Sequence, residues 1–598
     1  MNDKTNDFSI KVGTENGSGS QTSNLTILRA IFKMGIPVTG KNMFPSNIQG
    51  LPTWYTLRIS KDGYMARRDE IEVMVAMNVK SFERDVAEVE VGGVLFYDDS
   101  IKLPIERDDI TIYPMPVKQL IKESGISSKL RTMVSNMVYV GILAEMLDID
   151  MEKIKMALDF HFKGKAKPVE INMNIIEASA KWAKGNLEKS DGFSLEAMDK
   201  TDGLIMADGN TAAALGSIYG GVQVAGWYPI TPATSLIEKM NYYLPRLRTA
   251  KDGDHTYAIV QAEDELAAVG ITIGGAWTGA RAMTSTSGAG ISLMGEFVGF
   301  AYFAEIPIVI WNVQRMGPST GLPTRTSQGD LNQAYYLSQG DTKHIVLLPG
   351  SVRECFEFGW KSLDIAEEMQ TPVFVLSDLD LGQNQWASEP FEYPDVEMKR
   401  GKILWEEDFE KFIEEHGEWG RYNDVDGDGI AYRTGAGNRK QGSTYFTRGT
   451  GHDTFANYSE DPDVWMKTMN RLTLKHETAK KYVPEAIVDN VVGAKIGIIA
   501  YGSVDPAIIE ARDLLAKSGV KTNYLRLRAL PITETVENFI KENDEVYIVE
   551  MNHAGQLRDI LRTVMPAEST KLFSSTLNNG LSLTAKWVAE DILNKKEK

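Results

Sequence analysis

The sequence predicts a multidomain α/β protein. Its 598 residues exceed what one hydrophobic core can hold, so about three or four domains are expected. Between residues 204 and 400, short apolar runs that end in Gly/Pro turns alternate with segments of helical periodicity. This pattern is typical of a parallel sheet wrapped by helices. Similar alternation before and after this region predicts an α/β domain on either side of it.

The first domain is expected at residues 1–188. The sequence pattern predicts strands at 8–14, 54–59, 71–78, 89–97 and 110–113, and helices at 25–34, 130–147, 151–162 and 171–184. A Gly/Ser turn follows the first strand, but Thr22 stands where a dinucleotide-binding motif has its third glycine, after Gly17 and Gly19. No acidic residue at the end of a second strand completes the motif, so it does not support a dinucleotide site.

A largely polar linker is expected at 189–203, followed by the parallel-sheet domain at 204–400. Its strands are predicted at 223–227, 257–261, 281–285, 306–313, 344–348 and 373–376, with helices that include 263–276 and 352–369. Residues 401–485 are polar and glycine-rich but hold too many aromatic residues for disorder, so an ordered excursion packed on the central domain is expected.

The last domain is expected at 486–598. Strands are predicted at 496–501, 522–527 and 546–550. Between the first two, a helix is predicted with Asp505 as its N-cap, Pro506 at its first position and Gly519 at its end. Residues 550–557, Glu-Met-Asn-His-Ala-Gly-Gln-Leu, are expected to be structural or to form an interface.

Composition excludes several classes of protein. A net charge of -18 argues against a nucleic-acid surface. The single cysteine, Cys355, excludes an internal disulfide and a cysteine-ligated iron–sulfur cluster in this chain, and it fits a reducing compartment. The most apolar segment, 297–311, is interrupted by Glu305 and Pro307 and is too short to cross a bilayer. With no apolar signal core at the N-terminus, we expect a cytoplasmic protein that does not bind a membrane.

A rigid turn follows the first strand of the central domain. Pro229 and Pro232 fix φ and remove two backbone donors, so the hydroxyl of Thr231 is held on a backbone that cannot easily move. Turns at the carboxyl ends of strands present ligand-contacting groups in open α/β sheets. The alternative is a capped strand-to-helix connection with Thr234 or Ser235 as N-cap.

Three further strand ends carry residues that could take part in catalysis or ligand binding. Glu263, Asp264 and Glu265 open a helix, where carboxylates either complement the helix dipole or face a cofactor. Residues 284–288, Thr-Ser-Thr-Ser-Gly, gather hydroxyl groups in a turn. Arg315 leaves a very apolar strand into the Gly/Pro-rich loop 315–324, which suits bidentate binding of a carboxylate or a structural ion pair.

Four motifs, in this order and spacing, closely resemble the α subunit of 2-oxoacid:ferredoxin oxidoreductases. They are Tyr-Pro-Ile-Thr-Pro at 228–232, Gln-Ala-Glu at 261–263, Thr-Ser-Thr-Ser-Gly at 284–288 and Arg-Met-Gly-Pro-Ser-Thr-Gly-Leu-Pro-Thr at 315–324. The resemblance covers nearly the whole chain and is closest to the 2-oxoglutarate-using members. It implies a γ-type α/β domain, then a thiamine diphosphate pyrimidine-binding parallel-sheet domain, then a smaller transketolase-C-like α/β domain.

The resemblance also implies roles for residues. Glu263 matches the carboxylate that hydrogen-bonds the aminopyrimidine ring of thiamine diphosphate and so promotes loss of the thiazolium proton. The negative charges of Asp264 and Glu265 would complement the positive end of the helix dipole. Thr231, Arg315 and Thr324 match residues that bind the substrate carboxylate or orient its carbonyl. The wall against the pyrimidine would consist of Tyr228, Pro229 and Ile230.

A metal and diphosphate site is not expected in this chain. Gly427-Asp428-Gly429 with Asn457 has the spacing of a diphosphate–magnesium motif, but residues 418–426 form no buried strand and no helix follows that could cradle phosphate. Asp424, Asp426 and Asp428 begin like a calcium loop, but Gly435 stands where the bidentate glutamate belongs. A turn rich in solvated aspartates is expected, and a divalent ion there is left open. Magnesium and a [4Fe-4S] cluster are therefore expected in a separate β subunit.

The expected function is oxidative decarboxylation of 2-oxoglutarate to succinyl-CoA, with coenzyme A as co-substrate and ferredoxin as electron acceptor. An (αβ)2 assembly is expected, and the chain alone should be inactive. One alternative is the same chemistry on pyruvate or on a branched-chain or aromatic 2-oxoacid. Another, of a different class, is a non-catalytic electron-transfer or nucleotide-binding scaffold, because fold alone does not decide function.

Overall fold

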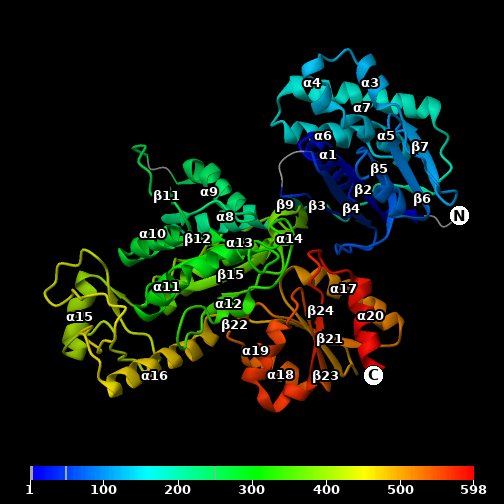
Figure 1. Cartoon of the computed structure of the whole chain (residues 1–598). Helices are drawn as coiled ribbons and strands as arrows, with labels where there is room; N and C mark the ends of the chain where they lie inside the picture. Colours follow the sequence, from blue (N-terminus) through cyan, green and yellow to red (C-terminus); the bar gives the residue numbers. More distant parts are fainter. Residues whose placement is uncertain (1–3, 47–49, 249–250, 598) are drawn as a thin grey trace.

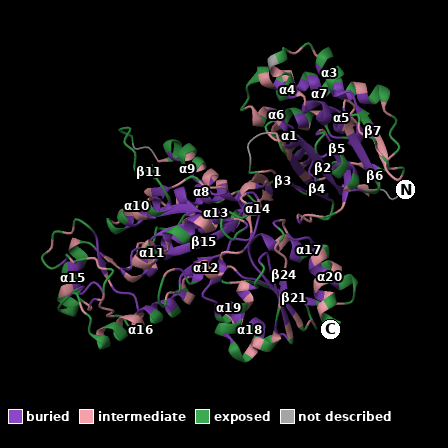
Figure 2. Cartoon of the chain, in the orientation of Figure 1, coloured by how far each residue is buried: buried purple, intermediate pink, exposed green. Residues whose placement is uncertain are grey.

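The computed structural model describes residues 4–46, 50–248 and 251–597. Three larger sheets follow one another along the chain, and Figure 1 shows them with their helices in blue to cyan, green, and orange to red. The predicted α/β class is confirmed. In Figure 2 the strands are largely buried while the outer faces of the helices are exposed.

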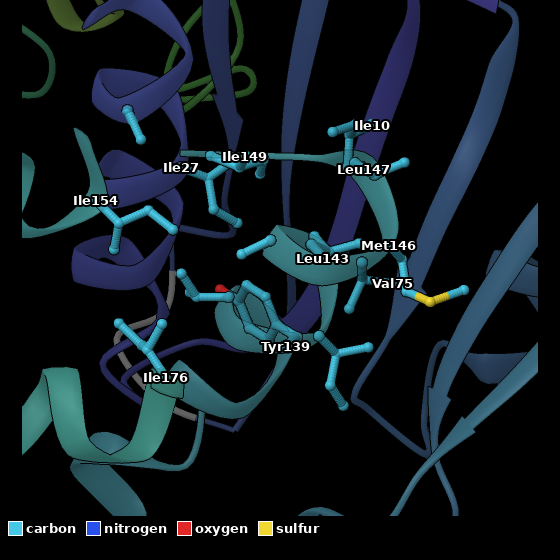
Figure 3. Packing of buried hydrophobic residues seen from close by; sticks show 14 of the residues in the cluster. Ile10, Ile27, Val75, Tyr139, Leu143, Met146, Leu147, Ile149, Ile154 and Ile176 are labelled. Carbon is cyan, nitrogen blue, oxygen red and sulfur yellow. The ribbon is translucent and has the colours of Figure 1, made fainter. Parts of the chain in front are cut away.

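The first sheet has six strands in the order β3-β4-β2-β5-β6-β7. β4 is antiparallel to β2 and β3, and the other neighbours are parallel. Helices α1, α5, α6 and α7 bury Ile27, Tyr139, Leu143, Ile154 and Ile176 together with Val75 of the sheet (Figure 3). The elements are β2 (Asp7–Glu15), α1 (Ser20–Lys33), β3 (Val38–Met43), β4 (Pro52–Ser60), β5 (Ile71–Ala76), α2 (Phe82–Ala87), β6 (Val89–Asp98), β7 (Thr111–Met115), α3 (Val117–Glu123), α4 (Ser128–Val134), α5 (Met137–Leu147), α6 (Met151–His161) and α7 (Ala166–Asn186).

Several features of this region differ from the prediction. Strand β3 and helices α2 and α3 were not expected, and residues 130–147 form two helices instead of one. The predicted linker 189–203 carries a short strand, β8 (Phe193–Ser194), which pairs with β1 (Lys4–Thr5). Phe193 and Leu195 are buried in the first core, so part of this segment packs as core rather than as a solvated connection.

The central sheet has seven strands in the order β11-β10-β12-β13-β15-β14-β22. The first six are parallel and match the six predicted strands, while β22 is antiparallel and comes from the C-terminal region. The elements are β9 (Ile205–Ala207), α8 (Gly209–Tyr219), β10 (Val224–Trp227), α9 (Thr234–Leu247), β11 (Ala258–Gln261), α10 (Glu265–Trp277), β12 (Ala282–Thr286), α11 (Gly288–Phe303), β13 (Val309–Gln314), α12 (Leu331–Tyr335), β14 (Ile345–Leu347), α13 (Val352–Met369), β15 (Val373–Asp378), α14 (Leu379–Gln383), β16 (Trp386–Ser388) and β22 (Ala529–Leu530).

Residues 401–485 are anchored to the central region by a buried carboxylate, that of Glu305. Lys475 of α16 donates to Glu305 at 2.8 Å, Arg471 also pairs with Glu305, and Arg421 donates to the Glu305 carbonyl at 2.9 Å. Burial favours protonation of Glu305, but the charges of Arg471 and Lys475 outweigh it and hold its pKa below the usual value. The ion cluster therefore fastens the excursion to the corner between α11 and β13. Its elements are β17 (Ile403–Leu404), α15 (Glu406–His416), β18 (Arg433–Thr434), α16 (Pro462–Thr478) and the short helix η1 (Ala479–Lys481).

The aspartate-rich turn has its own partners. Asp424 accepts from the amides of Gly427 and Gly429 at 2.9 and 2.7 Å, and Lys402 pairs with Asp426 and Asp428 at 2.6 and 2.9 Å. Within the described residues, no group of three or more His, Cys, Asp or Glu side chains could hold a metal ion. Lys402 therefore occupies the position that a cation would take between these carboxylates.

The last sheet has five strands in the order β19-β21-β20-β23-β24. Its elements are β19 (Ile487–Asp489), β20 (Ile496–Ala500), η2 (Gly502–Val504), α17 (Asp505–Lys517), β21 (Thr522–Arg526), α18 (Glu534–Glu542), β23 (Glu545–Glu550), α19 (Gln556–Val564), η3 (Pro566–Lys571), β24 (Leu572–Thr576) and α20 (Ala585–Lys596). The prediction of Asp505 as N-cap is wrong: the turn of 3-10 helix η2 runs directly into α17, so Asp505 is its first residue, and its carboxylate accepts from the Tyr524 hydroxyl.

None of the helices that the structure describes is both long and apolar enough to cross a membrane.

Candidate active site

The predicted site residues lie on loops that leave one edge of the central sheet. β10, β11, β12 and β13 are parallel neighbours, so the turns that follow them meet at the carboxyl ends of the strands. In open α/β sheets this edge is where ligands bind. The turn at 228–233, the start of α10, the start of α11 and the loop from Arg315 to Asp330 therefore share one location.

The turn after β10 is held by side chains rather than by a helix cap. The Thr234 hydroxyl accepts from the Ile230 amide at 2.9 Å and contacts the Ile230 carbonyl at 3.1 Å. Asn210 donates to the Pro232 carbonyl at 2.9 Å. Helix α9 begins at Thr234 after Ala233, without a side-chain cap, so neither alternative N-cap is used. Tyr228, Ile230 and Thr231 are half-buried and Pro229 is exposed, which leaves this turn as an accessible wall.

The three carboxylates at the start of α10 have different environments. Glu263 is exposed, and Asp264 caps the helix by accepting from the Ala267 amide at 2.7 Å. Glu265 is only 8% exposed and forms no hydrogen bond or salt bridge with the described residues. Its side chain lies against Gly290 of α11, where an added Cβ would come within 2.7 Å of the Glu265 Cγ atom. Glu265 is thus a largely buried residue whose carboxylate has no hydrogen bond or salt bridge among the described residues and interacts with Arg315 through its charge.

The sequence held a signal for Glu265 that the prediction did not use. Ala268, Val269 and Thr272 are buried and stand three, four and seven positions after Glu265. Side chains at this spacing share one face of a helix. Glu265 therefore belongs to the buried stripe of α10, whereas a residue that only complements the helix dipole would be expected to face water.

Arg315 and Thr231 are brought into direct contact. The guanidinium of Arg315 donates from Nη1 to the Thr231 carbonyl at 2.9 Å. Burial lowers the pKa of Arg315, while the charges of Asp330 and Glu265 oppose this shift. Among the described residues no carboxylate lies within 4 Å of the guanidinium, so Arg315 has no salt bridge there. Its remaining donors are available to a ligand carboxylate.

Thr324 lies on a different side of the same loop. The loop turns back so that the Met316 amide donates to the Arg325 carbonyl at 3.0 Å. The Thr324 hydroxyl donates to the Phe44 carbonyl at 2.8 Å, and Arg325 donates to the same carbonyl at 3.0 Å. Thr324 and Arg325 thereby line a cavity of about 470 Å³ between the three sheet regions, whose lining includes Lys41 and Arg84. Among the described residues no hydrogen bond joins Thr324 to Arg315.

Several buried polar atoms lie at the carboxyl ends of β12 and β13. The side-chain oxygens of Thr284, Ser285 and Ser287 and the Oδ1 atom of Asn312 are buried and have no hydrogen-bond partner among the described residues. Buried polar atoms without partners are uncommon in native proteins and mark places where a ligand or water completes the bonding. Gly288 and Gly290 matter here because an added Cβ would meet Asp330 or Glu265 within 3 Å.

This geometry suits a heteroaromatic cofactor and an anionic substrate. A buried carboxylate without a partner can accept a hydrogen bond from a ring nitrogen, and a guanidinium with spare donors can bind a carboxylate. Beside the turn that carries Tyr228 the chain is accessible, because Glu263 and residues 258, 260 and 261 of β11 are exposed. The described residues therefore form one wall of a site.

Comparisons with known proteins agree with this description. Residues 215–426 match the family model described as pyruvate flavodoxin/ferredoxin oxidoreductase, thiamine diphosphate-binding, and residues 9–182 match that of pyruvate ferredoxin/flavodoxin oxidoreductase. The α subunit of 2-oxoacid:ferredoxin oxidoreductase 1 of Aeropyrum pernix is 30% identical over 93% of this chain and 92% of its own length. The 2-oxoglutarate synthase subunit KorA of Methanothermobacter thermautotrophicus is 34% identical over 59% of this chain and 89% of its own length.

A solved structure covers nearly the whole chain. The 2-oxoglutarate:ferredoxin oxidoreductase of Magnetococcus marinus, solved with 2-oxoglutarate, coenzyme A and succinyl-CoA bound, matches 99% of this chain and 100% of its own with a TM-score of 0.87 and 28% identity. The N-terminal, central and C-terminal regions of this chain therefore have the same arrangement as in that structure. The chain belongs to the 2-oxoacid:ferredoxin oxidoreductases, as an α subunit.

Proposed function

We propose that this subunit, paired with a β subunit, catalyses the coenzyme A-dependent oxidative decarboxylation of 2-oxoglutarate to succinyl-CoA and passes the electrons to ferredoxin. The observation that carries the proposal is the half-site in which Arg315 contacts Thr231 while the buried carboxylate of Glu265 has no partner among the described residues. The relatives from A. pernix and M. thermautotrophicus and the M. marinus structure support the reaction class and the substrate. Pyruvate and branched-chain or aromatic 2-oxoacids are the alternatives.

Thiamine diphosphate would bind along this wall. Tyr228, Pro229 and Ile230 would face its pyrimidine ring, and a carboxylate at the start of α10 would accept a hydrogen bond from that ring. Glu263 is the sequence-based candidate for that carboxylate, but the burial of Glu265 supports Glu265 more strongly. When bound, the cofactor supplies the carbanion chemistry that decarboxylation of a 2-oxoacid requires. Arg315, with Thr231 beside it and Thr324 on the same loop, would hold and orient the substrate.

The β subunit would supply the other wall, the magnesium–diphosphate site and the [4Fe-4S] cluster. Helices α10 and α11 offer the surface for it, because α10 carries no charge after Glu265 and α11 carries one charged residue, Glu296. Trp277 and Leu293 are 43% and 51% exposed on these helices, and a helix that is apolar all round is normally covered. This face continues from the half-site, so a chain bound there would reach the cofactor. We propose an (αβ)2 assembly.

Coenzyme A is proposed to use the cavity beside Thr324. Arg325 has no carboxylate partner among the described residues, and the pKa of its guanidinium is lowered by burial and by the charge of Arg84. Two cations that repel each other in a cavity favour an anionic group between them. The phosphates of coenzyme A would provide that charge. A cytoplasmic location, expected from the sequence, stays a prediction.

The test is to purify the chain with its β partner and assay a panel of 2-oxoacids for coenzyme A-dependent reduction of ferredoxin. We expect the highest kcat/KM with 2-oxoglutarate and no turnover by the chain alone. A higher kcat/KM with pyruvate or a branched-chain 2-oxoacid would replace the substrate but keep the reaction. If no 2-oxoacid supported reduction, the chain would be a scaffold rather than a catalytic subunit.

A further inference from the structure

We propose that Asp330 is a positioning residue whose negative charge, acting without a salt bridge, orients the guanidinium of Arg315 above the end of β12 and so presents it to the carboxylate of a 2-oxoacid. The proposal rests on the proposed function, because it assigns Arg315 to the substrate. It concerns a residue outside the four motifs that point to the family.

The order of the strands places Asp330 at the strand end that the Arg315 side chain crosses. β12 lies between β10 and β13, and the side chain of Arg315, which follows β13, reaches the Thr231 carbonyl, which follows β10. It therefore crosses the end of β12, where α11 begins at Gly288. The carboxylate of Asp330 lies at this point, since a Cβ added at Gly288 would be 2.6 Å from both of its oxygens.

Asp330 is fixed by the strand that carries Arg315. Its carboxylate accepts from Asn312 at 3.1 Å, and its amide donates to the Gln314 side chain at 3.2 Å. The first turn of α11, a helix of 16 residues, adds unpaired N–H groups and the positive end of its dipole. The glycine at 288 is what allows the carboxylate to approach this helix end so closely.

The C-terminal sheet fixes the backbone on the other side of Asp330. The Gln328 amide donates to the Met551 carbonyl at 2.7 Å, and the Gln328 side chain donates to the Tyr501 carbonyl at 2.8 Å and accepts from the Met551 amide at 2.9 Å. Asn552 donates to the Gln328 carbonyl at 3.2 Å. Residues 550–557, expected from the sequence to be structural or to form an interface, thus fix the segment that carries Asp330.

The charges around Asp330 determine how its attraction for Arg315 depends on pH. Burial raises the pKa of Asp330 to about 6, while the hydrogen bond from Asn312 and the charge of Arg315 act in the opposite direction. Glu265, at the start of α10, is the other carboxylate that faces Arg315, and the hydroxyl of Tyr501, from the C-terminal region, faces Asp330. As the pH falls through about 6, Asp330 takes up a proton and its attraction for Arg315 is lost.

The test compares the wild-type pair with its β subunit against the variants Asp330→Asn and Asn312→Ala, measuring KM and kcat for 2-oxoglutarate across pH. In the wild type, we expect KM to rise as the pH falls through the Asp330 transition. Asp330→Asn should have a KM raised about tenfold at all pH values, without that transition and with kcat changed less than about threefold, since a positioning charge acts mainly on binding. Asn312→Ala, which removes a bond that stabilises the charged form, should move the transition to higher pH.

Several results would overturn the proposal. One is an Asp330→Asn pair that assembles normally and keeps the wild-type KM or the wild-type pH transition. Another is a KM lowered by this variant, which would mean that Asp330 competes with substrate for Arg315. If Asp330→Asn did not assemble, an unshifted transition in Asn312→Ala would decide against it. Absence of turnover by the wild-type pair on any 2-oxoacid would instead refute the proposed function, and this inference with it.

Discussion

Replacing Glu265 with Gln is expected to abolish turnover while the variant still assembles with the β subunit. The substitution keeps the shape of a buried side chain that contacts Gly290 but removes the negative charge. A carboxylate that accepts a hydrogen bond from the aminopyrimidine ring contributes to proton transfer at the cofactor, and loss of such a group lowers rates by about 10²–10⁴-fold. Turnover of ferredoxin by the reconstituted pair measures this effect.

Glu263→Gln is the matched control two residues away. Because Glu263 is exposed, we expect its variant to keep turnover within about threefold, as surface substitutions outside a site usually do. A second readout, hydrogen–deuterium exchange at C2 of bound thiamine diphosphate followed by NMR, should slow in Glu265→Gln and not in Glu263→Gln. The opposite ranking of the two variants would return the role to Glu263.

Arg315→Lys is expected to lower kcat/KM for the 2-oxoacid by about 10–100-fold, mainly through KM. A lysine keeps the charge but cannot bind a carboxylate through two parallel donors or span to the Thr231 carbonyl in the same way. Loss of a hydrogen bond to a charged group is worth about 1.5–3 kcal/mol, which corresponds to this range. Initial rates at varied 2-oxoglutarate and saturating coenzyme A provide the measurement.

Arg325→Lys, in the same loop, is the companion variant. Arg325 donates to the carbonyls of Phe44 and Thr324 and lines the neighbouring cavity, so its substitution should raise KM for coenzyme A rather than for the 2-oxoacid. If Arg315→Lys left KM for the 2-oxoacid at the wild-type value, the placement of the substrate carboxylate on Arg315 would be wrong.

Long elements with clear periodicity were predictable from the sequence. The six parallel strands of the central sheet carry short apolar runs, most of them bounded by Gly or Pro, and each was found within a few residues of its expected place. Short elements that depend on distant partners were not predictable: β8 exists because it pairs with β1, and the two residues of β22 exist because they extend the central sheet from the C-terminal region. The domain boundaries themselves stay a prediction.

The candidate site also contains features that the sequence could predict and features that it could not. The loops that carry Thr231 and Arg315 could be placed at one sheet edge because parallel strands end there, and the two residues are in contact. Glu265 can pack against α11 only because residue 290 is a glycine and has no Cβ atom. Asp330 can approach α11 because residue 288 is also a glycine, and its carboxylate accepts a hydrogen bond from Asn312. These contacts join residues from separate strands and helices, so only the folded chain reveals them.

We propose that this chain forms only half of a thiamine diphosphate site. Isothermal titration of thiamine diphosphate with magnesium into the chain alone and into the chain with its β partner tests it most directly. We expect saturable binding to the pair and none to the chain alone, because the proposed pyrimidine wall is only part of the site and the described residues include no group of three or more His, Cys, Asp or Glu side chains that could hold the metal. Binding to the isolated chain as tight as binding to the pair would contradict the account.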